Sequence, residues 1–363
     1  MGVTIMQSFA FWYKEKSSNS NSPKDSPCSL TAVLNFNLWY ECGWKPKRKN
    51  AQPILDIGFK IYNLSQAEEL SFFLPFSISE AEKKNAISDL GCKFHSTELV
   101  DALFNESYRT TISANSKVIT VKQNLDPDSK DATAEPETFK IYQLDIEHDI
   151  TLEPFASGTI IKIPTENITT SHEKSSTATD SDTYYLRFRI HHSSLQTMIH
   201  QYEPWTRRIL GAVDATNMID FRYNNVRSLD RTLIEQFYRT GNKRIQVKSL
   251  HFLLMTKAYI DVESQTISSV RKLETNVWSD YICDDKKRNL EDIVAYHHSF
   301  KPKQNIQNGK KQNENFLTSA EIFLKIRKTK TKIVYYVIVA VLISIFSSFL
   351  SSFLTKYIPF LCH

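Results

Sequence analysis

The chain has 363 residues, a formal net charge of +5 and 41% hydrophobic residues, which is typical of a globular protein with one large domain or two smaller ones. It has eight glycines and no GxGxxG, Walker or GxSxG sequence, which excludes the common phosphate-loop and nucleophile-elbow classes. Five scattered cysteines without a CxxC pair exclude a disulfide scaffold and favour a reducing compartment.

The composition shifts along the chain predict an α+β fold: a β-rich cytosolic region with interspersed helices, followed by a single C-terminal transmembrane helix. The Ser/Thr-rich residues 169–182 are either a linker between two domains or a loop within one. The predicted order is a flexible segment at 1–29, a β-rich α+β domain at 30–168, the Ser/Thr-rich segment at 169–182, an Arg-rich α+β domain at 183–300, a polar tether at 301–315, a basic amphipathic juxtamembrane segment at 316–332, a transmembrane helix at 333–354 and a short exoplasmic tail at 355–363.

Hydrophobic periodicity predicts the individual elements. In residues 54–62, apolar side chains alternate with Asp56, Gly58 and Lys60, which indicates a strand with one face on a core. Ser79 and Glu82 form a capping box that predicts a helix. We expect strands at 54–62, 117–122, 139–146, 158–163, 184–190, 219–223 and 245–262, and helices at 79–90, 97–106, 195–210, 229–238 and 270–283.

Positive charge concentrates in residues 187–248, which hold nine Arg and two Lys against five Asp or Glu. Arg suits bidentate contact with phosphate or carboxylate, so convergence of these side chains would make an anion site. The alternative is a solvated surface on which Arg222 pairs with Asp220 and Arg231 pairs with Glu235. No nucleic-acid-binding signature accompanies the charge. The candidate ligand-binding residues are Arg187, Arg189, Arg207, Arg208, Arg222, Arg227 and Arg231.

The histidines and carboxylates do not define a metal site or a catalytic site. His191 and His192 are adjacent on a predicted strand, so their side chains point to opposite faces and do not ligate one ion together. Asp214 and Asp220 flank an apolar turn, and Asp56 and Asp145 lie on predicted strands. Because nothing in the sequence fixes their separation, we assign no catalytic residue, metal or cofactor.

The run at 333–354 has no charge, Pro or Gly and is long enough to cross a bilayer. Five basic residues precede it and only Lys356 follows, so the positive-inside rule predicts a cytoplasmic N-terminal region and a tail anchor. Before it, residues 316–332 are either an amphipathic helix on the membrane surface or an extension of the membrane helix. The predicted membrane-surface basic residues are Lys325, Arg327, Lys328, Lys330 and Lys332.

Small and hydroxyl side chains recur along one face of the predicted membrane helix. Such a stripe allows close helix approach and self-association into a homo-oligomer, or it is a plain anchor whose serines bond back to their own helix. The stripe consists of Ala340, Ser344, Ser348, Ser352 and Thr355.

These features favour a non-enzymatic, tail-anchored sensor whose cytosolic domain recognises a protein partner or an anionic ligand. Self-association of its helices would then perturb the membrane, a layout shared by defence and stress effectors of prokaryotes as an analogy of architecture only. The alternatives are a membrane-tethered hydrolase or transferase with an unrecognised site, and a passive adaptor that recruits a partner to the membrane.

Overall fold

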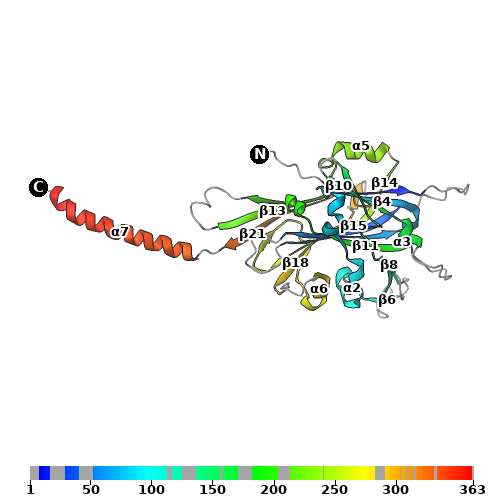
Figure 1. Cartoon of the computed structure of the whole chain (residues 1–363), viewed down its shortest axis with the longest axis horizontal. Coiled ribbons are helices and arrows are strands. Elements are labelled where there is room, and N and C mark those ends of the chain that lie inside the picture. Colours follow the sequence, from blue (N-terminus) through cyan, green and yellow to red (C-terminus); the bar gives the residue numbers. More distant parts are fainter. Residues whose placement is uncertain are drawn as a thin grey trace, which may run out of the picture.

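The computed structural model is rich in β-strands, has a few helices and ends in one long apolar helix, as the sequence predicts (Figure 1). Figure 1 shows this last helix extending away from the strand-rich body. The structure describes residues 8–16, 29–40, 52–112, 117–124, 136–155, 158–170, 182–202, 213–239, 241–282, 291–302, 304–307, 310–313, 316–330 and 333–361.

The largest element is a ten-stranded sheet with both parallel and antiparallel pairs. Its order is β17 (Ser269–Lys272), β18 (Ile293–Phe300), β15 (Gln246–Lys257), β2 (Thr31–Trp39), β3 (Ile54–Tyr62), β11 (Thr183–Ile190), β8 (Thr138–Tyr142), β7 (Val118–Gln123) and β6 (Tyr108–Ile112), with β5 (Ile87–Asp89) paired to β11. Strands β15 and β2 are parallel, as are β11 and β8. Strands from both sides of residues 169–182 therefore share one sheet, because β3 pairs with β11 and β2 with β15.

A five-stranded antiparallel sheet packs on one face of the ten-stranded sheet. Its order is β14 (Lys243–Arg244), β1 (Ala10–Glu15), β4 (Ala67–Leu74), β10 (Gly158–Pro164) and β9 (Thr151–Phe155). A continuous apolar core joins the two sheets. In it, the ring centroid of Phe59 lies 4.6 Å from that of Phe11 and 5.2 Å from that of Phe72. Each buried aromatic side chain contributes about 1.5–3 kcal/mol through removal of apolar surface from water.

Helices cover the outer faces of this sandwich, which gives four layers (Figure 1). Helix α5 (Arg231–Arg239) lies over the five-stranded sheet, where the ring of Phe237 packs edge-on against Trp12. Helices α2 (Thr97–Phe104) and α6 (Thr275–Ile282) lie on the opposite side, against the ten-stranded sheet. The second face of the large sheet is thus only partly covered, by two short helices.

In three of the predicted helices, part of the described segment has another structure. The capping box of Ser79 and Glu82 is present, but the helix expected at 79–90 gives way to strand β5 because that segment pairs with β11. Tertiary pairing overrides helix propensity here. The helix expected at 270–283 is strand β17 followed by α6. Of the helix expected at 195–210, residues 195–202 are a 3-10 helix followed by a strand, and residues 203–210 lie outside the described residues. The other short helices among the described residues are α1 (Lys83–Ala86), α3 (Glu166–Thr170) and 3-10 helices at Leu64–Gln66, Glu80–Glu82, Gly91–Lys93 and Ser193–Met198.

A four-stranded sheet carries the chain to its C-terminal helix. Its order is β12 (Ile199–Tyr202), β13 (Val213–Tyr223), β21 (Ala320–Lys330) and β16 (Asp261–Glu263). The juxtamembrane helix expected within 316–332 is wrong, because β21 pairs with β13 from Ala320 to Lys330. Ile322, Leu324 and Ile326 are buried at alternate positions, which is the period of a strand. Upstream, in the predicted tether, β19 (Gln304–Gln307) and β20 (Lys310–Asn313) pair with each other.

Helix α7 (Ile333–Leu361) contains the predicted membrane segment. Within it, Val337–Leu354 is long and apolar enough to cross a membrane and is exposed, and it is the single such helix among the described residues. This fits a membrane location. The Ser344 hydroxyl donates to the Ala340 carbonyl at 2.9 Å, the back-bonding expected of a plain anchor. Association of copies through the hydroxyl stripe stays a prediction.

Candidate ligand-binding cleft

A cleft of about 540 Å³ opens between the ten-stranded sheet and the helices α2 and α6. Strands β2, β3, β15 and β18 supply its floor, and α2 and α6 supply side walls through Phe104 and Trp278. Its lining is Val33, Asn35, Asn37, Lys60, Tyr62, Ala102, Leu103, Phe104, Asn105, Glu106, Tyr108, Glu137, Ser249, His251, Leu253, Ser269, Arg271, Trp278, His297 and Lys301.

The cleft is polar because the two faces of each strand carry different residues. In β2, the side chains of Leu34 and Phe36 enter the core between the sheets, whereas Asn35 and Asn37 line the cleft. The same alternation places Lys60 of β3 on the cleft face. The floor of the cleft therefore carries amides and charged groups where a sheet covered by helices usually carries apolar side chains.

Beside this floor, on the same face of the sheet and under α6, lies a buried ion pair between Asp56 of β3 and Arg189 of β11. The Arg189 guanidinium donates from Nε to Asp56 Oδ1 at 2.7 Å and from Nη2 to Oδ2 at 3.0 Å. Trp39 Nε1 and Tyr281 Oη also donate to Asp56 Oδ2, at 2.8 and 2.9 Å. Burial alone would raise the pKa of Asp56, but the Arg189 charge and these hydrogen bonds hold it below its ordinary value.

Arg187, on the same strand face, is also fully buried but contacts neutral groups. Its Nε donates to Tyr281 Oη at 2.6 Å and its Nη1 to Tyr185 Oη at 2.7 Å. The Asn37 side-chain amide takes the orientation in which both its nitrogen and its oxygen are hydrogen-bonded. In that orientation the oxygen accepts from Arg187 Nη2 at 2.8 Å. The amide of Asn35 is hydrogen-bonded to Tyr185. The two cleft amides are thus fixed by the buried cluster.

Gly58 leaves the space that this cluster occupies. A Cβ atom at Gly58 would lie 2.3 Å from Tyr185 Oη and 3.0 Å from Arg187 Nη1. Glycine within a strand commonly marks a site of close approach, and here the approaching groups are a phenol and a guanidinium.

A chain of polar contacts runs along the floor of the cleft, between the neighbouring strands β15 and β18. His251 Nδ1 and His297 Nε2 lie 3.1 Å apart, and Ser249 Oγ lies 3.2 Å from His251 Nε2. Because two lone pairs repel at that separation, one imidazole nitrogen of the facing pair carries a proton. Burial, helped by the nearby His297, lowers the pKa of His251 to about 4, and burial also lowers the pKa of His297. Both rings are therefore neutral at neutral pH.

At the other end of the cleft, Lys60 is held among aromatic rings. Its ammonium pairs with Glu137 Oε2 at 2.6 Å and lies 4.1 Å from the centre of the Phe139 ring. Burial lowers the pKa of Lys60, and the Glu137 contact opposes that effect. The pair thus keeps a charged lysine inside a largely apolar wall.

The five predicted arginines that the structure describes occupy different parts of the fold. Arg187 and Arg189 share a strand face, as predicted, but they lie beside the cleft under α6 and are buried rather than exposed. Arg222 pairs with Asp220 at 2.6 Å on β13, and Arg231 contacts Glu235 at 3.5 Å on α5. These two pairs are the ones that the surface alternative predicts.

None of the other predicted residues that the structure describes lines the cleft. Arg227 lies between β13 and α5, where its backbone N donates to the Asn225 side-chain oxygen at 2.9 Å. Arg207 and Arg208 fall outside the described residues, as does Lys332. Asp214 and Asp220 do not flank a turn, since both lie within β13. On the exposed side of β21, Arg327 and Lys325 contact Glu263 at 3.0 and 3.7 Å.

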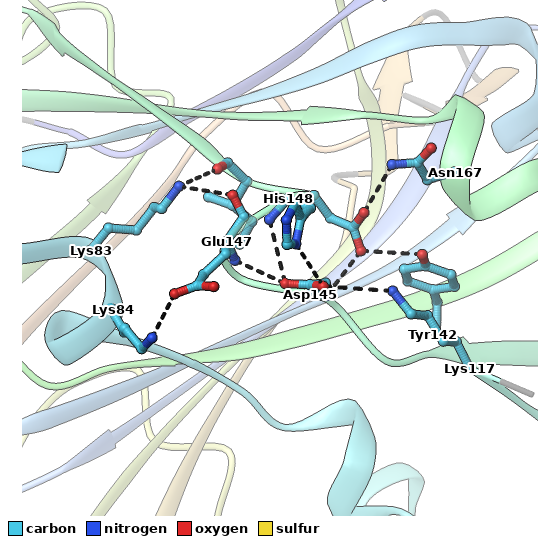
Figure 2. A network of polar contacts seen from close by, with 10 residues as sticks. Lys83, Lys84, Lys117, Tyr142, Asp145, Glu147, His148 and Asn167 are labelled. Carbon is cyan, nitrogen blue, oxygen red and sulfur yellow. Dashed lines mark hydrogen bonds and ion pairs between the residues drawn. The ribbon is translucent and has the colours of Figure 1, made fainter. Parts of the chain in front are cut away.

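A second polar network holds the turn after β8 (Figure 2). Asp145, expected on a strand, lies in this turn and accepts from the ring of His148 at 2.9 Å. The buried carboxylate of Asp149 accepts from Tyr142 Oη at 3.2 Å and from Asn167 Nδ2 at 3.0 Å. These contacts hold the turn against β8 and α3. The carboxylates of Asp145 and Asp149 therefore have a structural role.

Within the described part of the chain, no group of three His, Cys, Asp or Glu side chains is placed to hold a metal ion. His192 reaches Glu82 at 3.4 Å, and His191 donates its backbone N to the Ala86 carbonyl. No protein-family model matches this chain, and a search of curated proteins finds no relative.

The sequence pattern that marks the cleft is short. Asn35 and Asn37 lie at i and i+2 within the otherwise apolar run of β2, and His251 and Ser249 repeat that spacing in β15. Polar residues at alternate positions of an apolar strand indicate a face that is not ordinary core. Hydrophobic periodicity within each segment did not predict that these residues lie close together in the fold.

Proposed function

We propose that this protein is a tail-anchored, single-pass membrane protein whose β-rich domain is a receptor for a small polar ligand. The observation that carries the proposal is the cleft of about 540 Å³, whose floor is polar and is fixed by an adjoining buried hydrogen-bond network. Ligand pockets commonly enclose about 300–1,000 Å³ and combine apolar walls with a few fixed polar groups. The apolar helix α7 supports the membrane part of the proposal.

The direct continuation of the four-stranded sheet into α7 supports a role in which ligand binding acts at the membrane. Strand β21 ends at Lys330 and α7 begins at Ile333, so two residues link them. The basic residues of β21 then lie next to the predicted cytoplasmic leaflet, where Lys and Arg are attracted to anionic lipids.

The test fills the cleft without touching its buried floor. Val33 lines the cleft and is partly exposed, so Val33→Trp places an indole in the ligand space. In thermal-shift measurements on the full chain in detergent, fragments from a library of mixed charge should raise the melting temperature of the wild type and not that of Val33→Trp. Ser88→Trp, at an exposed position of β5, is the matched control and should respond like the wild type. Equal responses of all three proteins would reject the cleft as a binding site.

A second candidate function, a membrane-tethered hydrolase, is favoured by the order Ser249, His251, His297. In such a site Ser249 Oγ attacks an ester carbonyl and forms an acyl-ester. His251 Nε2 takes the hydroxyl proton and passes it to the leaving alcohol, and water then releases the acid while His297 orients His251. The pKa of His251, about 4, makes it a weak base at neutral pH, which places this candidate second.

Covalent labelling separates the two functions. A fluorophosphonate probe should label the wild-type chain if Ser249 is a nucleophile, and Ser249→Ala should abolish the labelling. Ser269→Ala is the control, because Ser269 also lines the cleft but has no part in the histidine chain. Labelling that is absent, or that survives Ser249→Ala, would eliminate the hydrolase.

A further inference from the structure

We propose that the cleft takes a small anion, a molecule with a carboxylate or phosphate group beside a ring. This inference rests on the ligand-binding role proposed above and specifies the chemical class of the ligand. Four features of the described residues lead to the anionic group: occupied carboxylates, a free donor, an excess of cationic side chains and two buried guanidinium groups that share one carboxylate. A fifth, the apolar part of the lining, leads to the ring.

The carboxylates of the cleft already have donors of their own. Glu137 accepts from Lys60 at 2.6 Å and from Tyr62 Oη at 3.2 Å. Glu106 accepts from Tyr108 Oη at 3.0 Å and from Gln123 Nε2 at 2.9 Å. A cationic ligand would have to displace these donors, whereas an anionic ligand leaves them in place.

A buried donor remains without a partner. The Trp278 indole is 1% exposed and lines the cleft, and its Nε1–H has no hydrogen-bond partner among the described residues. A buried polar group that lacks a partner is destabilising, so a bound acceptor would be favoured.

The charges around the cleft also favour an anion. Lys60, Arg271 and Lys301 line it, against the carboxylates of Glu106 and Glu137. With both histidines neutral, three cationic side chains face two anionic ones. Low-dielectric walls concentrate the resulting positive potential within a cleft.

Beside the floor, two buried guanidinium groups share a single carboxylate. Arg189 is bound to Asp56, and the hydrogen bonds of Arg187 go to two phenols and the Asn37 amide. Asp56 interacts with both groups, but one carboxylate does not balance two guanidinium charges, and an anion beside Asn37 would be attracted to the remaining positive charge. Asn37 lines the cleft, so the buried charge acts one side chain away from the ligand space.

The rest of the lining suits a ring. Tyr62, Phe104 and Leu253 present apolar surface in the same cleft. A planar apolar group can pack on such surfaces while its anionic substituent accepts hydrogen bonds.

The test compares probes of one shape and different charge. Benzoate, phenyl phosphate, neutral benzamide and cationic benzamidinium are each titrated into the full chain in detergent, and the melting temperature is recorded. A ligand at about ten times its Kd should raise the melting temperature by roughly 2–4 °C. We expect this rise with benzoate or phenyl phosphate, and a clearly smaller one with the other two. Which anion binds more tightly distinguishes a carboxylate ligand from a phosphate ligand.

Charge reversal at the rim supplies the second measurement. Lys301→Glu should weaken binding of the anionic probe by about five- to tenfold, because it turns an attraction into a repulsion at short range. Lys272→Glu, an exposed charge reversal on β17 outside the cleft lining, is the matched control and should leave the affinity unchanged.

The outcomes separate this inference from the receptor role. A rise only with benzamide or benzamidinium, abolished by Val33→Trp, overturns the anionic class and leaves the cleft as a binding site. A rise with the anions that persists in Val33→Trp, or no rise with any of the four probes, overturns both proposals.

Discussion

Replacing Asp56 with Ala should lower the free energy of unfolding by about 3–5 kcal/mol, the usual effect of removing one partner of a buried ion pair. The substitution leaves Arg189 buried without its carboxylate and removes the acceptor of Trp39 and Tyr281. Urea denaturation of the full chain in detergent, followed by tryptophan fluorescence, measures the loss.

The matched control is Asp220→Ala, which removes the carboxylate of an ion pair with Arg222 that is partly exposed to water. Solvent screening limits such pairs to about 0–1 kcal/mol. Similar losses for the two variants would contradict the central structural role of Asp56.

Placing two acidic residues in the middle of α7, as Ile343→Asp with Phe346→Asp, should move the protein from the membrane pellet to the soluble fraction. Each Asp at the centre of a membrane helix costs about 2.5–3.5 kcal/mol on insertion scales. Both side chains are exposed on α7 and lie within its apolar segment. Fractionation of cells expressing the full chain, with a carbonate wash, measures the distribution.

The control for this experiment replaces two exposed apolar side chains of the β-rich domain, as Val226→Asp with Tyr259→Asp. It adds the same charge without touching α7 and should leave the protein in the pellet. If the α7 variant also stayed there after the wash, α7 would not be the anchor.

Local pattern predicted the elements whose periodicity is strong. The strand expected at 54–62 is β3 with the same bounds, and the helix expected at 97–106 is α2 (Thr97–Phe104). The alternation in β11 also assigned Arg187 and Arg189 to one face. It did not indicate that this face is buried, because the covering helix α6 comes from a segment far along the chain.

The cleft depended on contacts that one sequence does not display. Ser249 and His251 meet His297 and lie beside Asn35 only because β15 pairs with β18 on one side and with β2 on the other. Such pairings join distant segments, and their register decides which side chains share a face. The strand β21 was missed for a local reason. Its basic residues lie beside an apolar run, a pattern that is also typical of a helix at a membrane surface.

The two-residue link between β21 and α7 limits how far the domain can move from its anchor. Two residues span at most about 7 Å, whereas a flexible linker of fifteen residues has an end-to-end distance of roughly 20 Å. The predicted tether at 301–315 adds nothing to this reach, because it precedes β21 and the chain returns to the sheet before the helix begins. In the proposed membrane arrangement, the domain would stay at the bilayer surface and turn together with its helix. A molecule that enters the cleft would then bind to a domain that diffuses only laterally, along the membrane surface.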